Sequence, residues 1–301
     1  MFVFFLCRYF GGFVKLLLSV GIICAYAFSV YAVADTTKTI KVDTTHKSPW
    51  KISSSVGLNA NQIALANWTQ GGANSIAWTS FGTFSATLAE STWTAKNNVK
   101  ITYGQTKLGS ADFRTNDNEI YAESVFSYNA SWKVNPFFSN ALRTVITNGF
   151  DYSKTPEVQT AAFFDPGYLT QSLGFEYAKD KLFLTRLGIA LQEVFTNRFT
   201  TYSDDPTTTE IERFKIDTGI ESVTESNLPI AENMQFGSKL RLFSRYKTID
   251  VWDVRWDNTL TAKINKLFNV NLNILMVYQK DQSARTQLKQ ALQMGITYTI
   301  I

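Results

Sequence analysis

The sequence predicts an all-β protein, a transmembrane antiparallel up-and-down β-barrel of about twelve strands, within a range of about ten to fourteen. Three observations predict it. Alternating apolar and polar residues recur from Trp50 to Ile301, long and short connections take turns between these stretches, and an export signal precedes them. A period of two cannot come from helices, in which apolar residues recur every three to four positions. The combination is typical of barrels in the outer membrane of Gram-negative bacteria.

Residues 1–34 have the character of a cleaved secretory signal peptide. Residues 16–28 form an apolar run, and residues 32–34 (Ala-Val-Ala) supply the small side chains that signal peptidase prefers. Asp35 is therefore the predicted first mature residue. Two alternatives stay open: a retained transmembrane helix, and a translation start near Val14.

Cysteine and charge narrow the protein class further. Cys7 and Cys24 are the only cysteines, and both lie in the signal peptide. Ile23 stands where a lipobox needs a small residue, which disfavours lipidation of Cys24. We therefore expect no disulfide and no cysteine metal site in the mature chain. Loss of Arg8 and Lys15 leaves 27 basic and 25 acidic residues, a net charge of +2 that does not indicate nucleic-acid binding.

The mature chain divides into a polar, flexible periplasmic lead-in (35–49) and one barrel domain (50–301). Each predicted strand places apolar residues at alternate positions, opposite polar ones. The first strand, for example, sets Trp50, Ile52, Val56 and Leu58 on one face. The predicted strands cover residues 50–58, 75–88, 93–103, 119–132, 137–152, 168–177, 183–195, 213–221, 234–242, 252–260, 269–278 and 292–300.

The connections indicate how the barrel is oriented, because short turns of such barrels face the periplasm and longer loops face outward. With both termini periplasmic, the strand number must be even. Residues 225–233 are long for a turn and residues 245–250 are short for a loop. All six prolines fall in the predicted connections, as expected for a residue that cannot donate to a sheet. The predicted turns are 89–92, 133–136, 178–181 and 265–267, and the predicted loops are 59–74, 107–118, 152–167, 197–209 and 281–288.

A large soluble β-protein is the rival architecture. The predicted strands are about ten to fifteen residues long, whereas strands of soluble sheets have about five or six. The chain also stops within a strand at Ile301, although that residue is out of phase with the apolar face ending at Ile300. Aromatic residues near the short turns are expected to form a girdle at the membrane surface. They are Trp93, Trp132, Phe137, Phe138, Tyr177, Phe183, Trp256 and Phe268.

Four motifs give the chain a resemblance to a known family. They read N-W-T-Q-G-G-A-N-S at 67–75, F-R-T-N-D-N at 113–118, F-D-P-G-Y-L at 164–169 and W-D-N-T-L-T-A-K-I-N-K at 256–266. With these motifs, the chain resembles domain of unknown function 3078 (DUF3078), found in outer membranes of Bacteroidota-type bacteria. The resemblance implies an outer-membrane barrel and brings no substrate, cofactor or catalytic residue.

The first motif lies in the first outer loop, where Gly71 and Gly72 permit positive φ angles. One interpretation is a structural loop that folds against the rim. The other is an inward constriction or a docking surface for a partner. The residues of this loop motif are Asn67, Trp68, Gly71, Gly72 and Ser75.

Catalysis is not expected. The single histidine, His46, lies in the lead-in before the first strand, whereas barrel hydrolases resemble one another in needing a histidine near the outer rim. No cluster of His, Cys, Asp and Glu has the spacing of metal ligands, and no cofactor is predicted.

Charged residues of both signs alternate with the apolar ones and should face the lumen. One interpretation is a network of ion pairs that plugs and rigidifies the interior, and the other is a polar pore. The predicted lumen residues are Lys100, Glu119, Glu123, Arg143, Arg186, Arg213, Lys215, Asp217, Glu221, Lys239, Arg241, Asp253, Arg255 and Asp257.

The sequence therefore favours a narrow pore for small polar solutes, embedded in outer-membrane lipid. The alternative is a structural barrel that docks a partner outer-membrane protein or lipoprotein. An enzyme acting on lipids is a more distant third hypothesis.

Overall fold

The computed structural model describes residues 49–67, 71–180, 182–205, 207–280 and 283–301. The predicted signal peptide and the lead-in up to residue 48, with Cys7, Cys24 and His46, lie outside these residues, and so does Trp68. Among the described residues, no helix is long and apolar enough to cross a membrane.

Twelve antiparallel strands close into one barrel, which confirms the predicted fold class. Each barrel strand pairs with the next in the chain, except that β5 pairs with β8, because β6 and β7 form a separate two-stranded sheet. The strands are β1 (Trp50–Ile63), β2 (Ser75–Ala89), β3 (Trp93–Leu108), β4 (Arg114–Tyr128), β5 (Asn135–Thr144), β6 (Gly149–Asp151), β7 (Val158–Ala161), β8 (Gly167–Lys179), β9 (Phe183–Phe195), β10 (Phe214–Ala231), β11 (Met234–Arg245), β12 (Trp252–Lys263), β13 (Phe268–Gln279) and β14 (Ser283–Thr299).

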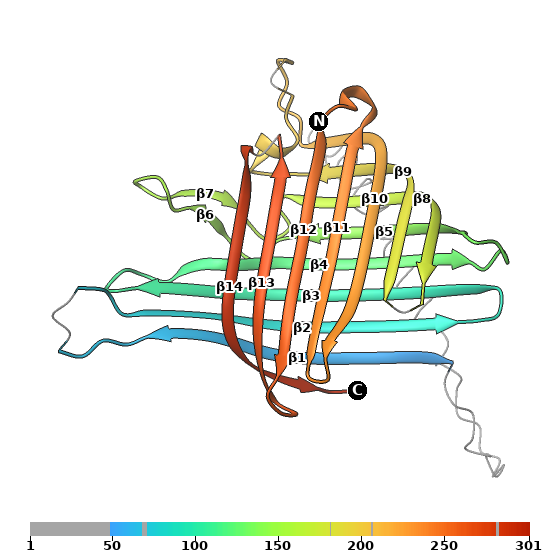
Figure 1. Cartoon of the computed structure of the whole chain (residues 1–301). Helices are drawn as coiled ribbons and strands as arrows, with labels where there is room; N and C mark the ends of the chain where they lie inside the picture. The colour runs from blue at the N-terminus through green and yellow to red at the C-terminus, as the bar shows by residue number, and fades with distance from the viewer. Residues whose placement is uncertain (1–48, 68–70, 181, 206, 281–282) are drawn as a thin grey trace, which may run out of the picture. The chain divides into compact units, whose positions relative to one another are not determined.

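The last strand closes the barrel against the first. β1 and β14 pair antiparallel from Ser55 opposite Thr299 to Ala60 opposite Met294. The pairing continues past β14, because the N–H of Ile300 donates to the carbonyl of Ser54 at 2.8 Å. In Figure 1 the wall of β11–β14 crosses steeply over the wall of β1–β4, as strands tilted to a barrel axis must do.

Several predicted strand boundaries are wrong in the same direction. β10 continues to Ala231, so the expected turn 225–233 shrinks to 232–233, and β14 begins at Ser283, so the expected loop 281–288 shrinks to 280–282. β5 ends at Thr144, and residues 149–151 belong to β6. Strand ends that leave the membrane meet water on both faces, so their sequence need not alternate.

Two prolines lie within strands, contrary to the sequence prediction. Pro136 is the second residue of β5, and Pro229 lies near the end of β10, where the register shifts between Pro229 and Ala231. Both positions are near strand ends or a bulge, where a missing N–H donor disrupts little of the ladder.

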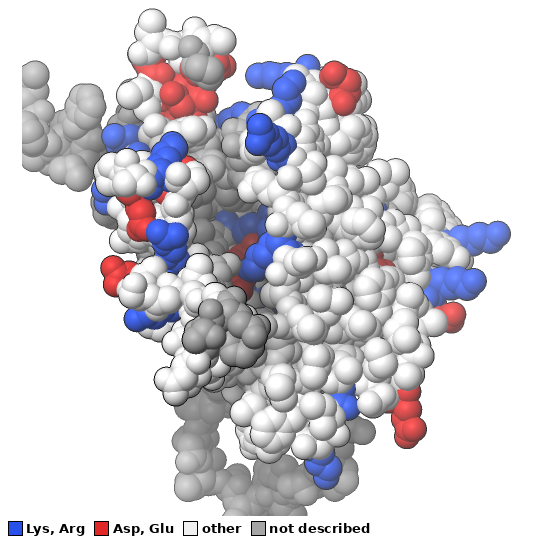
Figure 2. Space-filling model, turned by 60° about the vertical axis from the view of Figure 1, so that its left-hand side comes forward, with Lys and Arg blue, Asp and Glu red and all other residues white. Residues whose placement is uncertain are grey.

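The outer face of the barrel is apolar, as contact with lipid requires. Alternate residues such as Leu187, Ile189 and Leu292 are more than half exposed. Figure 2 shows a broad uncharged surface on the barrel, with charged residues mainly along its edges.

Two short 3-10 helices lie in outer connections, at the end of the barrel opposite the start of β1 and the end of β14. They are Thr200–Tyr202, between β9 and β10, and Tyr246–Thr248, between β11 and β12.

Part of the predicted aromatic girdle is present at the outer face. Trp93 stacks on Phe126 with ring centroids 5.5 Å apart, and Trp132 is largely exposed. Two assignments are wrong: Phe137 is 4% exposed and lies beneath Arg186 in the lumen, and Trp256 lies mid-strand in β12.

Paired glycines bring β8 and β9 unusually close on the inner face. Gly174 lies directly opposite Gly188, and a Cβ on Gly188 would lie 2.5 Å from the carbonyl oxygen of Leu173. Small inner residues of this kind let a barrel wall bend sharply.

We expect Gly188→Ala to destabilise the barrel by about 1–3 kcal/mol, because the strands must separate to admit the methyl group. Urea unfolding in lipid vesicles, followed by tryptophan fluorescence, would measure this. Gly82→Ala is the matched control, since nothing lies within 4 Å of a Cβ there. Equal stability of the two variants would contradict the close approach.

Candidate functional site

The structure places thirteen of the fourteen predicted lumen charges on the inner faces of barrel strands. They come from β3, β4, β5, β9, β10, β11 and β12, and most of them pair with one another across the interior. Arg213 is the exception, since it is exposed in the connection before β10 and is not part of the barrel wall.

Two of the ion pairs that cross the lumen form what we call the crossbar: Glu119–Arg255 and Glu123–Lys239. The Nη2 of Arg255 on β12 lies 3.1 Å from Oε2 of Glu119 on β4, and the Nζ of Lys239 on β11 lies 2.8 Å from Oε2 of Glu123 on β4. Five strands separate β4 from β12 in either direction around the barrel. The crossbar therefore joins opposite walls and divides the interior into two parts.

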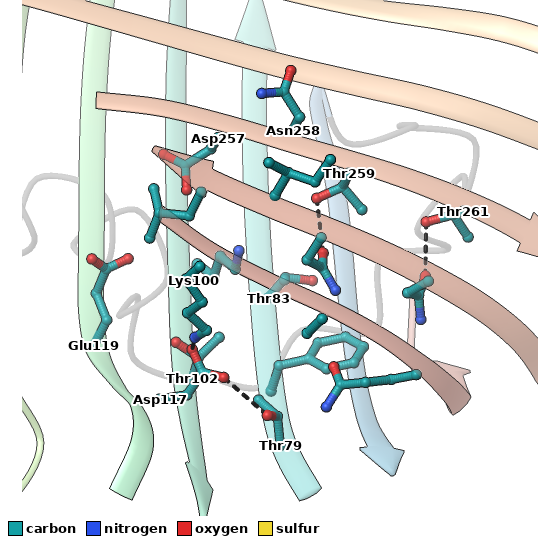
Figure 3. Close-up of a pocket in the computed structure, with 18 of the residues that line it drawn as sticks. Thr79, Thr83, Lys100, Thr102, Asp117, Glu119, Asp257, Asn258, Thr259 and Thr261 are labelled. Carbon is teal, nitrogen blue, oxygen red and sulfur yellow. Dashed lines mark hydrogen bonds and ion pairs between the residues drawn. The ribbon is translucent and has the colours of Figure 1, made fainter. Parts of the chain in front are cut away.

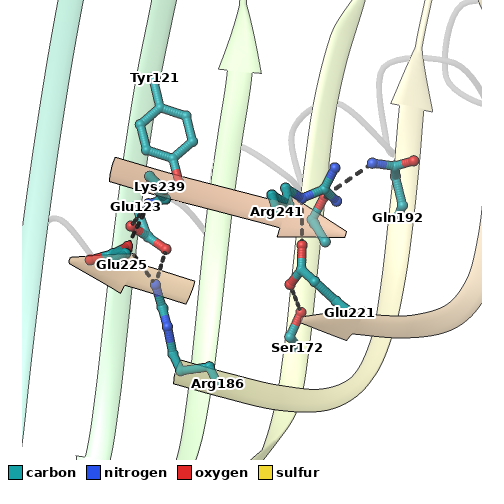
Figure 4. A network of polar contacts seen from close by, with 10 residues as sticks. Tyr121, Glu123, Ser172, Arg186, Gln192, Glu221, Glu225, Lys239 and Arg241 are labelled. Carbon is teal, nitrogen blue, oxygen red and sulfur yellow. Dashed lines mark hydrogen bonds and ion pairs between the residues drawn. The ribbon is translucent and has the colours of Figure 1, made fainter. Parts of the chain in front are cut away.

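Glu123 of the crossbar is also the centre of a buried network that extends to one side of it. Arg186 lies 2.8 Å from Glu123 and 3.0 Å from Glu225, and Lys239 lies 2.8 Å from each of these carboxylates. Lys239 also donates to the hydroxyl of Tyr121 at 3.1 Å (Figure 4). Arg186 and Glu123 have side chains only 4% and 5% exposed, so each needs the other to offset its loss of water.

A second network fills the space beside the first. The Nε of Arg241 lies 2.6 Å from Glu221, whose other oxygen accepts a hydrogen bond from Ser172 (Figure 4). Nearer the loop end, Arg245 bridges Asp217 at 2.8 Å and Asp253 at 3.0 Å.

Apolar side chains complete the filling of this side. Phe137, Val194, Val223 and Phe243 are all buried, and Arg241 and Arg245 lie over the ring of Phe243. We call the region enclosed by β5 and β8–β11 the packed half. In the packed half, the lumen charges form a network of ion pairs.

A cavity of about 580 Å³ occupies the other side of the crossbar. Its lining comes from β2, β3, β4, β12, β13 and β14 and is rich in threonine and asparagine. Figure 3 shows Thr259 and Thr261 of β12 on one side and Thr79 and Thr102 on the other. Near the short turns, the cavity is lined by Lys263 and Thr297. It extends from there toward the end that carries the longer loops, where Asp117 and Lys289 line it.

Amide side chains are ordered along the β13 wall of this cavity. The side-chain N–H of Asn271 donates to the amide oxygen of Asn59 at 3.1 Å. The side-chain amide oxygen of Asn271 accepts a hydrogen bond from the hydroxyl of Thr261 at 2.8 Å. Asn273 accepts from Thr259 at 3.0 Å. These contacts fix the wall as a row of neutral hydrogen-bonding groups.

Several lumen residues were missed by the sequence prediction, chiefly because they lay in misplaced connections. Glu225, Asp117, Lys289 and Arg245 belong to or adjoin stretches that were expected to be loops or turns. Lys289 forms an ion pair with Asp117 across the lumen and donates to the carbonyl of Asn116 at 3.0 Å. Correct strand ends would have placed all four on inner faces.

Some described residues of the first outer loop adopt a left-handed backbone, and the loop contacts the next outer loop. Asn67, Gly71 and Gly72 adopt positive φ angles of 54°, 82° and 116°. The carbonyl of Asn74 accepts from the N–H of Gly109, which ties this loop to the next one. Of the described motif residues, including Ser75 at the start of β2, none lines the cavity.

The larger outer connections are tied together by Asp165. Its carboxylate accepts hydrogen bonds from the N–H groups of Asn197 at 3.0 Å and Arg198 at 2.7 Å, so it joins the β5–β8 connection to the β9–β10 connection. Within the latter, hydrogen bonds from Thr207 hold the pKa of Asp205 below its usual value. Across the described part of the chain, no group of His, Cys, Asp and Glu is arranged to hold a metal ion.

Comparison with known families confirms the resemblance expected from the motifs. The family described as "Protein of unknown function (DUF3078)" matches residues 60–150, which extend from the end of β1 to β6. No curated protein matches the chain.

Solved structures similar to the chain include three bacterial membrane barrels. They are the translocator domain of the autotransporter NalP from Neisseria meningitidis (9% identity, TM-score 0.36, covering 82% of this chain and 86% of that one), an outer-membrane channel from Pseudomonas putida F1 (6%, 0.39, 82% and 94%) and a mutant porin from Rh. blastica (8%, 0.26, 83% and 100%). The fold assignment rests on this chain's own strand order and register.

Proposed function

We propose that the protein is a narrow pore for small polar solutes in the outer membrane of a Gram-negative bacterium, exported by a cleaved signal peptide at residues 1–34. The observation that carries the proposal is the polar cavity beside the crossbar. A barrel whose interior served only for rigidity would gain most from filling both halves, and this one fills only the packed half. We propose no catalytic step and no cofactor.

The size of the cavity supports small solutes. A volume of 580 Å³ lies within the range of about 300–1,000 Å³ that small-molecule sites occupy. Its threonine hydroxyls and asparagine amides can replace the water molecules that a polar solute loses on entry. Larger solutes would meet the crossbar.

Reconstitution of the purified barrel in planar bilayers tests the proposal. We expect small discrete conductance steps, and we expect Thr83→Trp to reduce them by about half or more, because an indole would enter a cavity of this width. Thr218→Trp is the matched control, since Thr218 is exposed on the outer face of β10. A folded, inserted wild-type barrel that gives no conductance would contradict the proposal.

The alternative function, docking of a partner outer-membrane protein or lipoprotein, is favoured by exposed apolar residues in the outer connections. Phe163 is 67% exposed and Ile211 is 70% exposed. Cross-linking of the barrel in native membranes would test it, with Phe163→Ser as the variant. Loss of one specific cross-linked species would favour docking, and recovery of the barrel alone would contradict it.

A further inference from the structure

The basic and acidic residues of the barrel are unevenly distributed around its wall. Five neighbouring strands, in the order β13, β14, β1, β2 and β3, contain no aspartate or glutamate. The same five strands carry six basic residues, namely Lys51, Lys96, Lys100, Lys107, Arg285 and Lys289. This arc of wall borders the cavity, whereas the carboxylates of the barrel strands lie on β4, β8, β9, β10 and β12.

Two of these lysines point inward on β3. Lys100 lines the cavity directly, opposite Thr83 of β2 (Figure 3). Lys96 lies two inward-facing positions from Lys100, toward the turn end of β3, and pairs in register with Val125, which is buried on the inner face of β4. Lys107, by contrast, points outward. It pairs in register with Ile76, an outer-face residue of β2, near the end of β3 that leads into the outer loop.

The carboxylates that line the cavity are already compensated. Asp117 pairs with Lys289, and Glu119 pairs with Arg255 at 3.1 Å and with Arg143 at 3.6 Å. Asp257 pairs with Arg255 at 2.8 Å.

Two lining cations, by contrast, have no ion pair with any described residue. They are Lys100 on β3 and Lys263 at the turn end of β12. The uncompensated charge of the cavity is therefore positive.

We propose that the cavity is selective for small anions, such as solutes that carry a phosphate or carboxylate group, with Lys100 as the cation that they pass at mid-depth. This inference rests on the proposed pore function. Low-dielectric walls focus the field of an uncompensated charge into a narrow opening, which raises the local concentration of counter-ions. The hydroxyls of Thr83 and Thr102 beside Lys100 can donate hydrogen bonds to an oxyanion.

The reversal potential of the reconstituted barrel in a KCl gradient tests this inference. We expect chloride to permeate severalfold faster than potassium. Lys100→Gln should bring the ratio toward unity, and adding Lys96→Gln should bring it closer still. Lys100→Arg should keep the preference, because it keeps the charge. Lys107→Gln is the matched control on the same strand and should leave the ratio unchanged.

The outcomes separate the two proposals. Conductance with no preference for chloride, or a preference that survives Lys100→Gln together with Lys96→Gln, would overturn anion selectivity and leave the pore intact. A folded barrel without conductance would overturn both. Addition of inorganic phosphate to one side should reduce the chloride current in the wild-type barrel more than in Lys100→Gln, and equal reduction would also count against the inference.

Discussion

Replacement of Glu123 by alanine should destabilise the barrel by about 3–5 kcal/mol, the usual cost of removing one partner from a buried ion pair. Glu123 holds Arg186 and Lys239 together, and the Arg186 side chain is only 4% exposed. Without the carboxylate, these two cations would share Glu225 alone and would repel each other. Urea unfolding of the refolded barrel in lipid vesicles measures the change.

The matched control for this experiment is Glu157→Ala. Glu157 also pairs with an arginine, Arg114, at 2.9 Å, but both side chains are about half exposed. Exposed pairs contribute about 0–1 kcal/mol. If Glu123→Ala cost no more than Glu157→Ala, water would have to reach Arg186 freely, and the packed half would not be packed.

Removal of the crossbar pair Glu119–Arg255 should enlarge the pore. In the double variant Glu119→Ala, Arg255→Ala, the side chains that meet between β4 and β12 are gone, and the cavity can extend toward the packed half. We expect the single-channel conductance to rise about twofold or more, since the conductance of a short pore follows its open cross-section. Cavity water can solvate Asp257, whose side chain is 39% exposed.

The double variant Arg114→Ala, Glu157→Ala serves as its control, because it deletes a pair of the same chemistry at the loop end of β4. Its conductance should match the wild type. An unchanged conductance in the Glu119, Arg255 variant would show that the crossbar does not limit the pore, and solutes would then have to be restricted elsewhere.

The sequence predicted the barrel and its strand number because membrane strands impose a pattern that few other structures share. Lipid-facing residues such as Leu187 and Ile189 must be apolar, while their inward neighbours are free to be polar. That requirement ends at the membrane surface. Residues 226–231 of β10 (Ser-Asn-Leu-Pro-Ile-Ala) do not alternate and include a proline, so they resemble a turn although they continue the ladder with β11.

The inner faces were predicted, but the grouping of their residues was not. Alternation places Glu119, Glu123 and Arg255 in the lumen without indicating that β4 meets β11 and β12 across it. Such contacts depend on how the wall curves, and the close approach of β8 and β9 at Gly174 and Gly188 helps to set this curvature. Phe137 was assigned to the girdle because an aromatic residue at a strand end gives no sign of which side it faces.

Charge asymmetry around the wall could have been read from the sequence. The absence of acidic residues from β1, β2, β3, β13 and β14 is visible in the chain, but it acquires meaning only once β1 is known to pair with β14. Closure brings the two ends of the chain together into one basic arc beside the cavity.

Labelling of single cysteines by a water-soluble methanethiosulfonate reagent tests the central claim, a lumen divided into an open cavity and a packed half. Residues 35–301 contain no cysteine, so each introduced thiol is unique in the mature chain. Ala291 lines the cavity, whereas Ala190 is 6% exposed in the packed half. We predict rapid modification of Ala291→Cys and protection of Ala190→Cys in the folded barrel. Equal protection or equal modification of the two thiols would contradict the divided lumen.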